Sequence, residues 1–130
     1  MKGSLPPLAS TITEISPWGF FGCNFVKLEI PETVTKINIR GFANCTALQE
    51  VTVHNPNCVF DGIGQADASG GKDPFNGSQQ SLVVKGHSNS TAQAYAKAKG
   101  YKFVIVDEKL ILDTLAFLNA ILPVSVMPIP

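Results

Sequence analysis

Three cysteines and two histidines are the side chains of this sequence that could most readily do chemistry: Cys23, Cys45, Cys58, His54 and His87. The cysteines are odd in number and widely spaced, which does not indicate a disulfide framework or a zinc site of the CxxC type. His54 lies four residues before Cys58, a spacing that suggests a Cys–His pair, but the sequence context of a thiol protease is absent. We therefore expect no catalytic residue, no metal and no cofactor.

Three acidic residues, Asp61, Asp67 and Asp73, lie within the Gly-rich segment DGIGQADASGGKD. A calcium loop needs its carboxylates closer together, as in D-x-D-x-D-G. The run Gly62-Ile63-Gly64 lacks the third glycine and the lysine of a phosphate-binding loop. We therefore expect residues 61–73 to form a solvated loop and not a calcium or phosphate site.

N-x-S/T triplets occur at Asn44, Asn76 and Asn89 and would matter only if the protein is exported from a cell that glycosylates. Asn44 adjoins a cysteine that we expect in the core, so we do not expect a glycan there.

The composition favours one folded domain that does not bind nucleic acid. Of 130 residues, 45% are hydrophobic and 15% are charged, and the formal net charge is zero, so no basic stripe is present. The first ten residues contain no apolar run, and we expect no secretory signal in them.

The chain repeats itself, and this repeat is what must position any functional residue. Residues 12–33 align with residues 34–57 after one gap, at an offset of 22 residues before the gap and 23 after it. A period of this length is typical of leucine-rich repeats, in which each coil stacks on the next. The aligned pairs are Ile12/Val34, Ile15/Ile37, Gly19/Gly41, Phe20/Phe42, Cys23/Cys45, Phe25/Leu48, Leu28/Val51 and Ile30/Val53.

Within each repeat, one segment alternates polar and apolar residues, which is typical of a strand with one buried face. Stacking would place the polar residues of these strands side by side on one outward surface. We take that surface as the candidate ligand-binding site, and its residues are Lys27, Glu29, Glu50, Thr52 and His54.

Cys23 and Cys45 occupy equivalent positions of the two repeats. They could form a redox pair, or they could be stacked, buried small hydrophobes. We favour the second interpretation, because equivalent side chains in adjacent coils point the same way. Cys58 follows a turn and could be exposed, but no residue near it in the sequence would activate it.

A third, distorted coil and a capping unit follow. Phe75 takes the place of Phe42, at 33 residues' distance, which implies an insertion of about ten residues around residues 61–73. Ser78 stands where the cysteine stood. The cap is a helix followed by a strand, with Ser90 and Gln93 as a capping box, Ala92, Tyr95 and Ala96 on one face, Gly100 as the C-terminal cap, and Phe103 and Ile105 as an inward pair.

Residues 109–130 are strongly apolar and predict a helix that ends before Pro123. The stretch is too short and too interrupted to span a membrane. The helix could pack on the solenoid, form a homo-oligomer contact through residues 109–122, or belong to an end that never evolved to pack. We expect it to be buried, because a fully buried Leu or Ile stabilises by about 1.5–3 kcal/mol.

The pattern I-P-x-x-V-T-x-I-x-x-x-x-F-x-x-C-x-x-L-x-x-V-x-V at residues 30–53 resembles the BspA-type leucine-rich repeat. The run GHSNSTAQAYAKAKGYKFV at residues 86–104 resembles the segment that closes such arrays. The resemblance implies a parallel, strand-rich solenoid with one helix in its capping unit, and the apolar pattern of residues 109–130 adds a C-terminal helix outside the resemblance. The expected organisation is an N-terminal extension (1–10), the solenoid (11–108) and the tail (109–130).

That resemblance also implies a non-catalytic cell-surface or secreted protein that binds a protein or glycoprotein, in adhesion or another protein–protein interaction. The alternative is a structural role, as the capping or self-associating end of a longer array.

Overall fold

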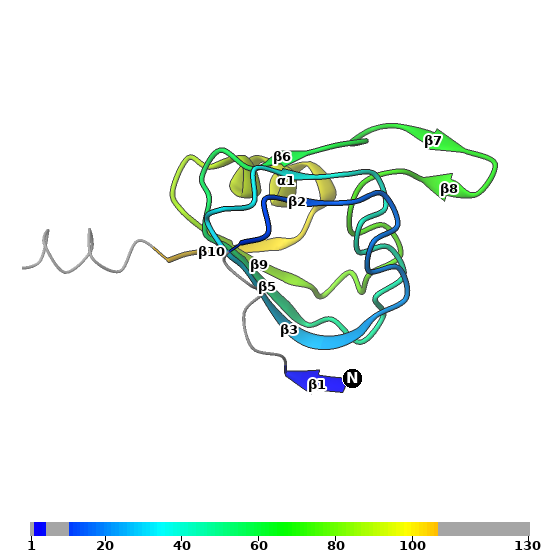
Figure 1. Ribbon diagram of the computed structural model, residues 1–130, viewed down its shortest axis with the longest axis horizontal. Coiled ribbons are helices and arrows are strands. Elements are labelled where there is room, and N and C mark those ends of the chain that lie inside the picture. The colour runs from blue at the N-terminus through cyan, green and yellow to red at the C-terminus, as the bar shows by residue number, and fades with distance from the viewer. Residues whose placement is uncertain (1, 5–10, 107–130) are drawn as a thin grey trace, which may run out of the picture.

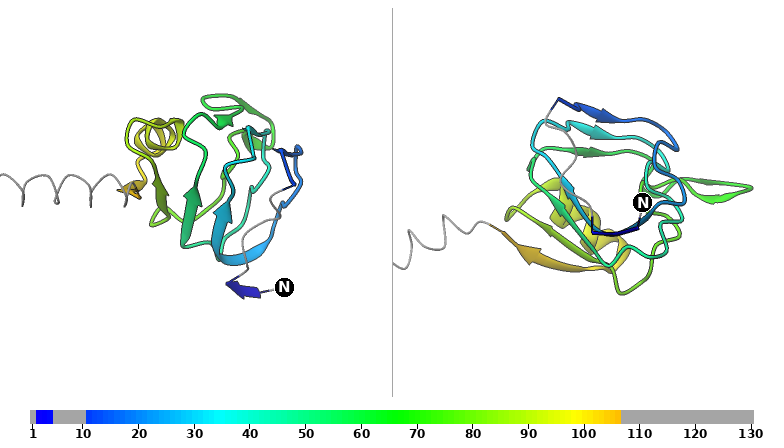
Figure 2. Two further views of the ribbon diagram at one scale, coloured as in Figure 1. Left: turned by 60° about the vertical axis from the view of Figure 1, so that its left-hand side comes forward. Right: turned by 60° about the horizontal axis from the view of Figure 1, so that its bottom comes forward.

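The computed structural model describes residues 2–4 and 11–106. The chain winds repeatedly around one core, and each turn lies beside the previous one (Figures 1 and 2). The strand-rich parallel solenoid predicted from the repeat is confirmed. The predicted helix at 109–122 and the rest of the tail lie outside the described residues. The elements are β1 (Lys2–Ser4), β2 (Glu14–Ile15), β3 (Asn24–Ile30), β4 (Lys36–Ile37), β5 (Glu50–Val53), β6 (Val59–Phe60), β7 (Ala66–Asp67), β8 (Gly70–Gly71), β9 (Val83–Gly86), α1 (Thr91–Lys99) and β10 (Lys102–Ile105).

Two parallel sheets form the walls of the solenoid, in the orders β1-β3-β5-β9-β10 and β2-β4-β6. Their register joins the residues that the repeat aligns: Leu28 pairs with Val51, and Val51 with Val84. The gap after the cysteine is therefore placed correctly. Residues 2–4, which the sequence assigned to an extension, form the edge strand β1 beside β3.

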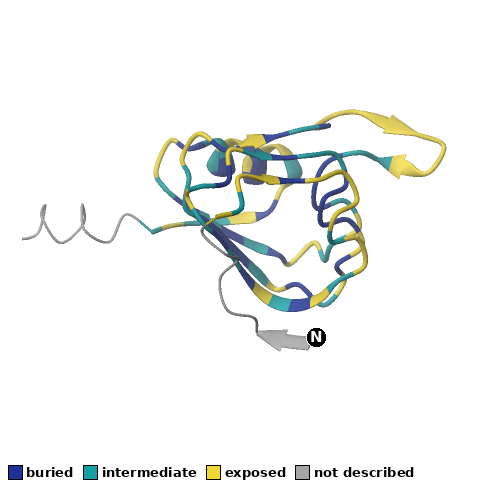
Figure 3. Cartoon of the chain, in the orientation of Figure 1, coloured by how far each residue is buried: buried dark blue, intermediate teal, exposed yellow. Residues whose placement is uncertain are grey.

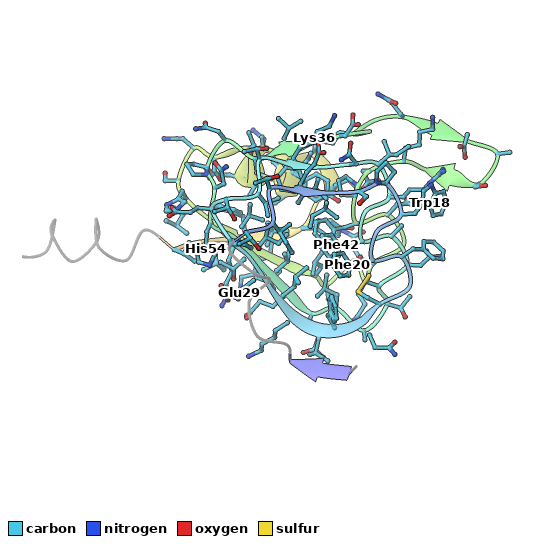
Figure 4. The ribbon with its side chains drawn as sticks, viewed as in Figure 1. Trp18, Phe20, Glu29, Lys36, Phe42 and His54 are labelled. Carbon is cyan, nitrogen blue, oxygen red and sulfur yellow. A yellow bond between two sulfur atoms is a disulfide. The ribbon has the colours of Figure 1, made fainter. Side chains whose placement is uncertain are left out.

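An aromatic column runs along the core. The rings of Phe20, Phe42 and Phe75 stack with centroids 5.1 Å apart at each step and nearly parallel planes. Figure 4 shows Phe20 and Phe42 inside the coil. The Tyr95 ring of α1 lies 6.0 Å from Phe75 and ends the column. The predicted equivalence of Phe75 is confirmed, so the insertion leaves the core positions of the third coil intact.

Cys23 and Cys45 form a disulfide, which corrects our interpretation of them as two separate hydrophobes. Their Cα atoms lie 4.9 Å apart, one strand spacing, and a disulfide accepts Cα separations of about 4.4–6.8 Å. Side chains that point the same way from adjacent coils are therefore close enough to bond. The bond ties the first coil to the second (Figure 4).

The insertion at 61–73 is not simply a solvated loop. It projects as the β7–β8 hairpin, whose strands are antiparallel and exposed (Figures 1 and 3). Asp67 in the hairpin accepts hydrogen bonds from Arg40. Asp73 at its base is only 3% exposed and accepts hydrogen bonds from the Tyr95 hydroxyl at 2.6 Å and the Lys99 ammonium at 3.1 Å. Asp61 pairs with Lys36 of β4, so all three carboxylates join the insertion to the rest of the fold.

The capping unit forms largely as predicted. The Ser90 side chain accepts a hydrogen bond from the backbone N–H of Gln93, and Gly100 ends α1 in the left-handed conformation with φ 77°. Ala92, Tyr95 and Ala96 are the buried face of the helix, also as predicted. The prediction that Phe103 and Ile105 of β10 both point inward is right for Phe103, which packs against the core. It is wrong for Ile105, which is 43% exposed because β10 is an edge strand.

We predict that Asp73→Ala lowers the free energy of unfolding by about 1–3 kcal/mol, because the buried Tyr95 hydroxyl then has no acceptor. Adding Tyr95→Phe removes that hydroxyl, so the double variant should lose less than the sum of the two single losses. Urea unfolding of the wild type and the three variants measures this coupling. Strictly additive losses would show that the hydrogen bond contributes nothing.

Candidate functional site

The five predicted binding residues all come from one surface, the outer side of β3, β5 and the residue after β5. Inward side chains such as Leu28, Val51 and Val53 alternate with them and are fully buried or nearly so. The register sets Lys27 beside Glu50 and Glu29 beside Thr52, and β9 continues the rows with Val83 and Lys85. We call this surface the strand face and define it by Lys27, Glu29, Glu50, Thr52, His54, Val83 and Lys85.

Charges on the strand face pair across the coils. His54 Nε2 lies 2.5 Å from Glu29 Oε1, and Lys85 Nζ lies 2.8 Å from Glu50 Oε2. Figure 4 shows Glu29 and His54 together at one end of the face. Paired opposite charges leave the face without a strong field of either sign, so it would not attract a highly charged ligand such as nucleic acid.

Thr52 contributes less surface than the sequence suggested. It lies on the outward side of β5, but it is only 6% exposed. Its side chain is short, and the register sets it between Glu29 and Lys85, which are long. A partner would therefore contact the charged side chains and not the threonine.

A shallow depression of about 370 Å³ opens at the other end of the strand face. Polar side chains make up most of its wall, so a hydrogen-bonding ligand suits it better than an apolar one. Its lining residues are Lys27, Gln49, Glu50, Gln79, Ser81 and Val83.

Cys58 does not lie in position to act as a nucleophile. It is fully buried and not exposed after its turn, and burial raises the pKa of that thiol to about 11. The reactive thiolate is therefore scarce at neutral pH. His54, the suggested base, pairs with Glu29 on the outer surface. Within residues 2–4 and 11–106, no group of three His, Cys, Asp or Glu side chains is arranged to hold a metal ion.

Arg40 builds a second site, which sequence reasoning missed. Its side chain is 5% exposed and clamps the β7–β8 hairpin, donating to both Asp67 carboxylate oxygens and to the carbonyls of Gly70 and Gly71. The guanidinium carbon also lies 4.9 Å from the centre of the Trp18 ring. The repeat aligns Trp18 with Arg40 as two variable positions, and stacking of equivalent residues was the signal that could have revealed this contact.

We predict that the pKa of Asp67 depends on Arg40. Hydrogen bonds from the guanidinium lower the pKa of this carboxyl to about 2, below its ordinary value of about 3.9. The pair therefore stabilises the hairpin above about pH 4 and loses this contribution as the pH falls through about 2. In Arg40→Lys, which lacks the bidentate fork, the carboxyl should titrate closer to its ordinary value. Carboxyl carbon chemical shifts followed against pH measure both values, and equal values in the two proteins would contradict this.

In the comparison with protein families, residues 7–63 match the model of the BspA type leucine rich repeat region (6 copies). No match was found among curated proteins or among solved structures. No helix in the described part of the chain is long and apolar enough to cross a membrane.

Proposed function

We propose that the strand face binds a protein or glycoprotein, because residues 7–63 match a BspA-type leucine-rich repeat region and such repeats are used in protein–protein interaction. We further propose that this binding serves adhesion at a cell surface or after secretion. One observation supports the choice of surface. No element of residues 2–4 and 11–106 packs over the outer side of β3, β5 and β9 (Figure 1).

The Cys23–Cys45 disulfide supports a location outside the reducing cytosol. Structural disulfides persist in secreted and surface proteins, whereas cytosolic thiols are kept reduced. The bond joins two coils within the residues that match the repeat region, so the disulfide belongs to the proposed binding module itself.

The small size of the strand face sets how such a module must bind. A stable protein interface covers about 800 Å² on each partner, and three short strands present less than that. Binding would therefore be weak for one copy. Several copies held together, or further coils beside these, would raise the affinity without any new kind of contact.

An exchange of paired charges tests this proposal. Glu50→Lys with Lys85→Glu keeps an ion pair on the strand face but reverses its direction. Lys36→Asp with Asp61→Lys makes the same kind of exchange on the opposite sheet, where those side chains lie 3.9 Å apart, and serves as the matched control. Beads coated with each protein are counted on cultured epithelial cells, with and without protease treatment of the cells.

We expect the strand-face exchange to reduce bead adhesion at least about fivefold, which corresponds to roughly 1 kcal/mol of binding free energy. The control exchange should leave adhesion unchanged, and protease treatment should abolish it. Equal adhesion by both exchanged proteins and the wild type, or adhesion that survives protease, would refute the proposal.

The alternative function, a capping or self-associating end, is favoured by the edge strand β10. Ile105 is 43% exposed there, and Val104 and Val106 are only partly buried. An apolar edge of this kind is covered in most folded proteins. The mass in solution of the full chain and of a chain ending at residue 108 tests the self-association: a full-length oligomer that becomes a monomer supports it, and two monomers contradict it.

A further inference from the structure

Two aromatic rings stand exposed on the turn between β2 and β3, away from the strand face. Trp18 is 45% exposed and Phe21 is 47% exposed, and their centroids lie 5.1 Å apart. Figure 4 shows Trp18 on the outside of the coil beside the β7–β8 hairpin. Together with the hairpin they border a depression of about 250 Å³, which we call the Trp18 pocket. It is lined by Trp18, Phe21, Arg40, Ala43, Asn44, Ser69 and Asn76.

The backbone at Trp18 is left-handed, and so is that of Arg40, the equivalent residue of the next coil, with φ 53°, so the turn of the two regular coils has this conformation. Trp18 has φ 61°, a left-handed conformation that is uncommon for a bulky residue and that glycine adopts without cost. The turn therefore accounts for the left-handed conformation, but it does not require a tryptophan. The exposed ring of Trp18 is the feature that a glycine at this position would lack.

The uncharged polar side chains of the Trp18 pocket have no hydrogen-bond partner within the described part of the chain. The side-chain amides of Asn44 and Asn76, the Ser69 hydroxyl and the Trp18 indole N–H make no hydrogen bond to it, whereas most polar side chains nearby do. These groups both donate and accept. They are available to a ligand that offers several hydroxyl or amide groups.

The only ionised side chain of the pocket, Arg40, is already satisfied. Its guanidinium donates four hydrogen bonds to the hairpin and pairs with Asp67. The guanidinium holds the Trp18 ring in place through its cation–π contact. Because the Asp67 carboxylate balances its positive charge, it attracts an added anion only weakly. The pocket is therefore suited to a neutral ligand.

We infer that the Trp18 pocket binds a neutral saccharide unit. The C–H face of a pyranose ring packs against an aromatic ring, and its hydroxyls exchange hydrogen bonds with amides and hydroxyls, which are the groups present here. A volume of about 250 Å³ suits one or two sugar rings and is below the range of about 300–1,000 Å³ typical of larger ligands. A proline-rich peptide would need a longer aromatic groove.

This site lies on a different surface from the strand face and does not depend on the proposed function. The two sites would allow one module to contact both the protein and the sugar of a glycoprotein. Each can be removed by substitutions that leave the other intact.

Trp18 is the single tryptophan of the chain, so its fluorescence reports directly on this pocket. The protein is made in bacteria, where Asn44 and Asn76 carry no glycan. It is titrated to roughly 10 mM, above the millimolar dissociation constants of weak ligands, with neutral oligosaccharides ending in glucose, galactose, mannose, fucose, N-acetylglucosamine or N-acetylgalactosamine. A sulfated oligosaccharide and a proline-rich peptide are titrated in parallel.

Two substitutions remove pocket groups with little cost to the fold. Asn44 has φ 56°, and Gly22 and Gly77 occupy its place in the neighbouring coils with φ 70° and 85°, so Asn44→Gly relieves backbone strain while removing the amide. Trp18→Gly relieves the strain at φ 61° and removes the ring, and its binding is measured by calorimetry. Thermal unfolding of both variants confirms that they remain folded.

We expect a saturable change in Trp18 emission with at least one neutral oligosaccharide. Binding should weaken at least about tenfold in Trp18→Gly and in Asn44→Gly, and should not change when Glu50 and Lys85 are exchanged. The inference is overturned if no neutral oligosaccharide gives a saturable change, if only the sulfated oligosaccharide or the peptide does, or if both glycine variants bind as the wild type does.

Discussion

Reducing the Cys23–Cys45 disulfide is expected to lower the free energy of unfolding by about 3 kcal/mol and the melting temperature by roughly 10–20 °C. The two cysteines are 22 residues apart, so the bond closes one full coil and restricts the unfolded chain. A solenoid of few coils has little other stability to draw on, because each coil contacts only its neighbours. Thermal unfolding with and without a thiol reductant measures the effect.

Two variants separate the disulfide from other effects of the reductant. Cys23→Ala with Cys45→Ala should already melt at the lower temperature and should not respond to reductant. Cys58→Ala removes the buried free thiol and should keep the full response. Thiol titration of the unfolded, unreduced wild type should find one thiol. Three thiols, or a melting temperature that reductant leaves unchanged, would show that the bond is absent or contributes nothing.

Phe42→Ala is expected to lower the free energy of unfolding by about 3–5 kcal/mol. Phe42 is fully buried and stacks on Phe20 at one face and Phe75 at the other, so its removal opens a cavity in the middle of the aromatic column. Domains of this size have about 5–15 kcal/mol in all, so the variant should be close to unfolding. The urea midpoint at constant transition slope measures the loss.

Phe21→Ala is the matched control, because it removes the same ring from a position that is 47% exposed. Its cost should stay within about 0.5 kcal/mol, as for most surface substitutions. Comparable losses for the two alanine variants would mean that the column is not the centre of the core.

The buried column and the strand register could be predicted because repetition carries the information. A solenoid places the same inward position of every coil in one line, so Ile15/Ile37, Phe20/Phe42 and Leu28/Val51 appear as apolar matches in the sequence alone. The third coil follows the same rule, and Phe75 was found despite the insertion before it. The caps at Ser90 and Gly100 depend on local backbone chemistry, which is also visible in the sequence.

The Cys23–Cys45 bond, the clamp of Arg40 on the hairpin and the burial of Asp73 depended on the tertiary structure. Each joins side chains whose distance is set by the spacing of coils or by the path of the insertion, and none of the three contacts appears in an apolar pattern. Thr52 and Ile105 show the same limit: alternation gives the side of the strand, but burial depends on long neighbours or on the sheet edge. The sequence by itself determined which residues recur from coil to coil. Only the tertiary structure decided which of the variable residues come into contact, because those contacts depend on the spacing of the coils and on the path of the insertion.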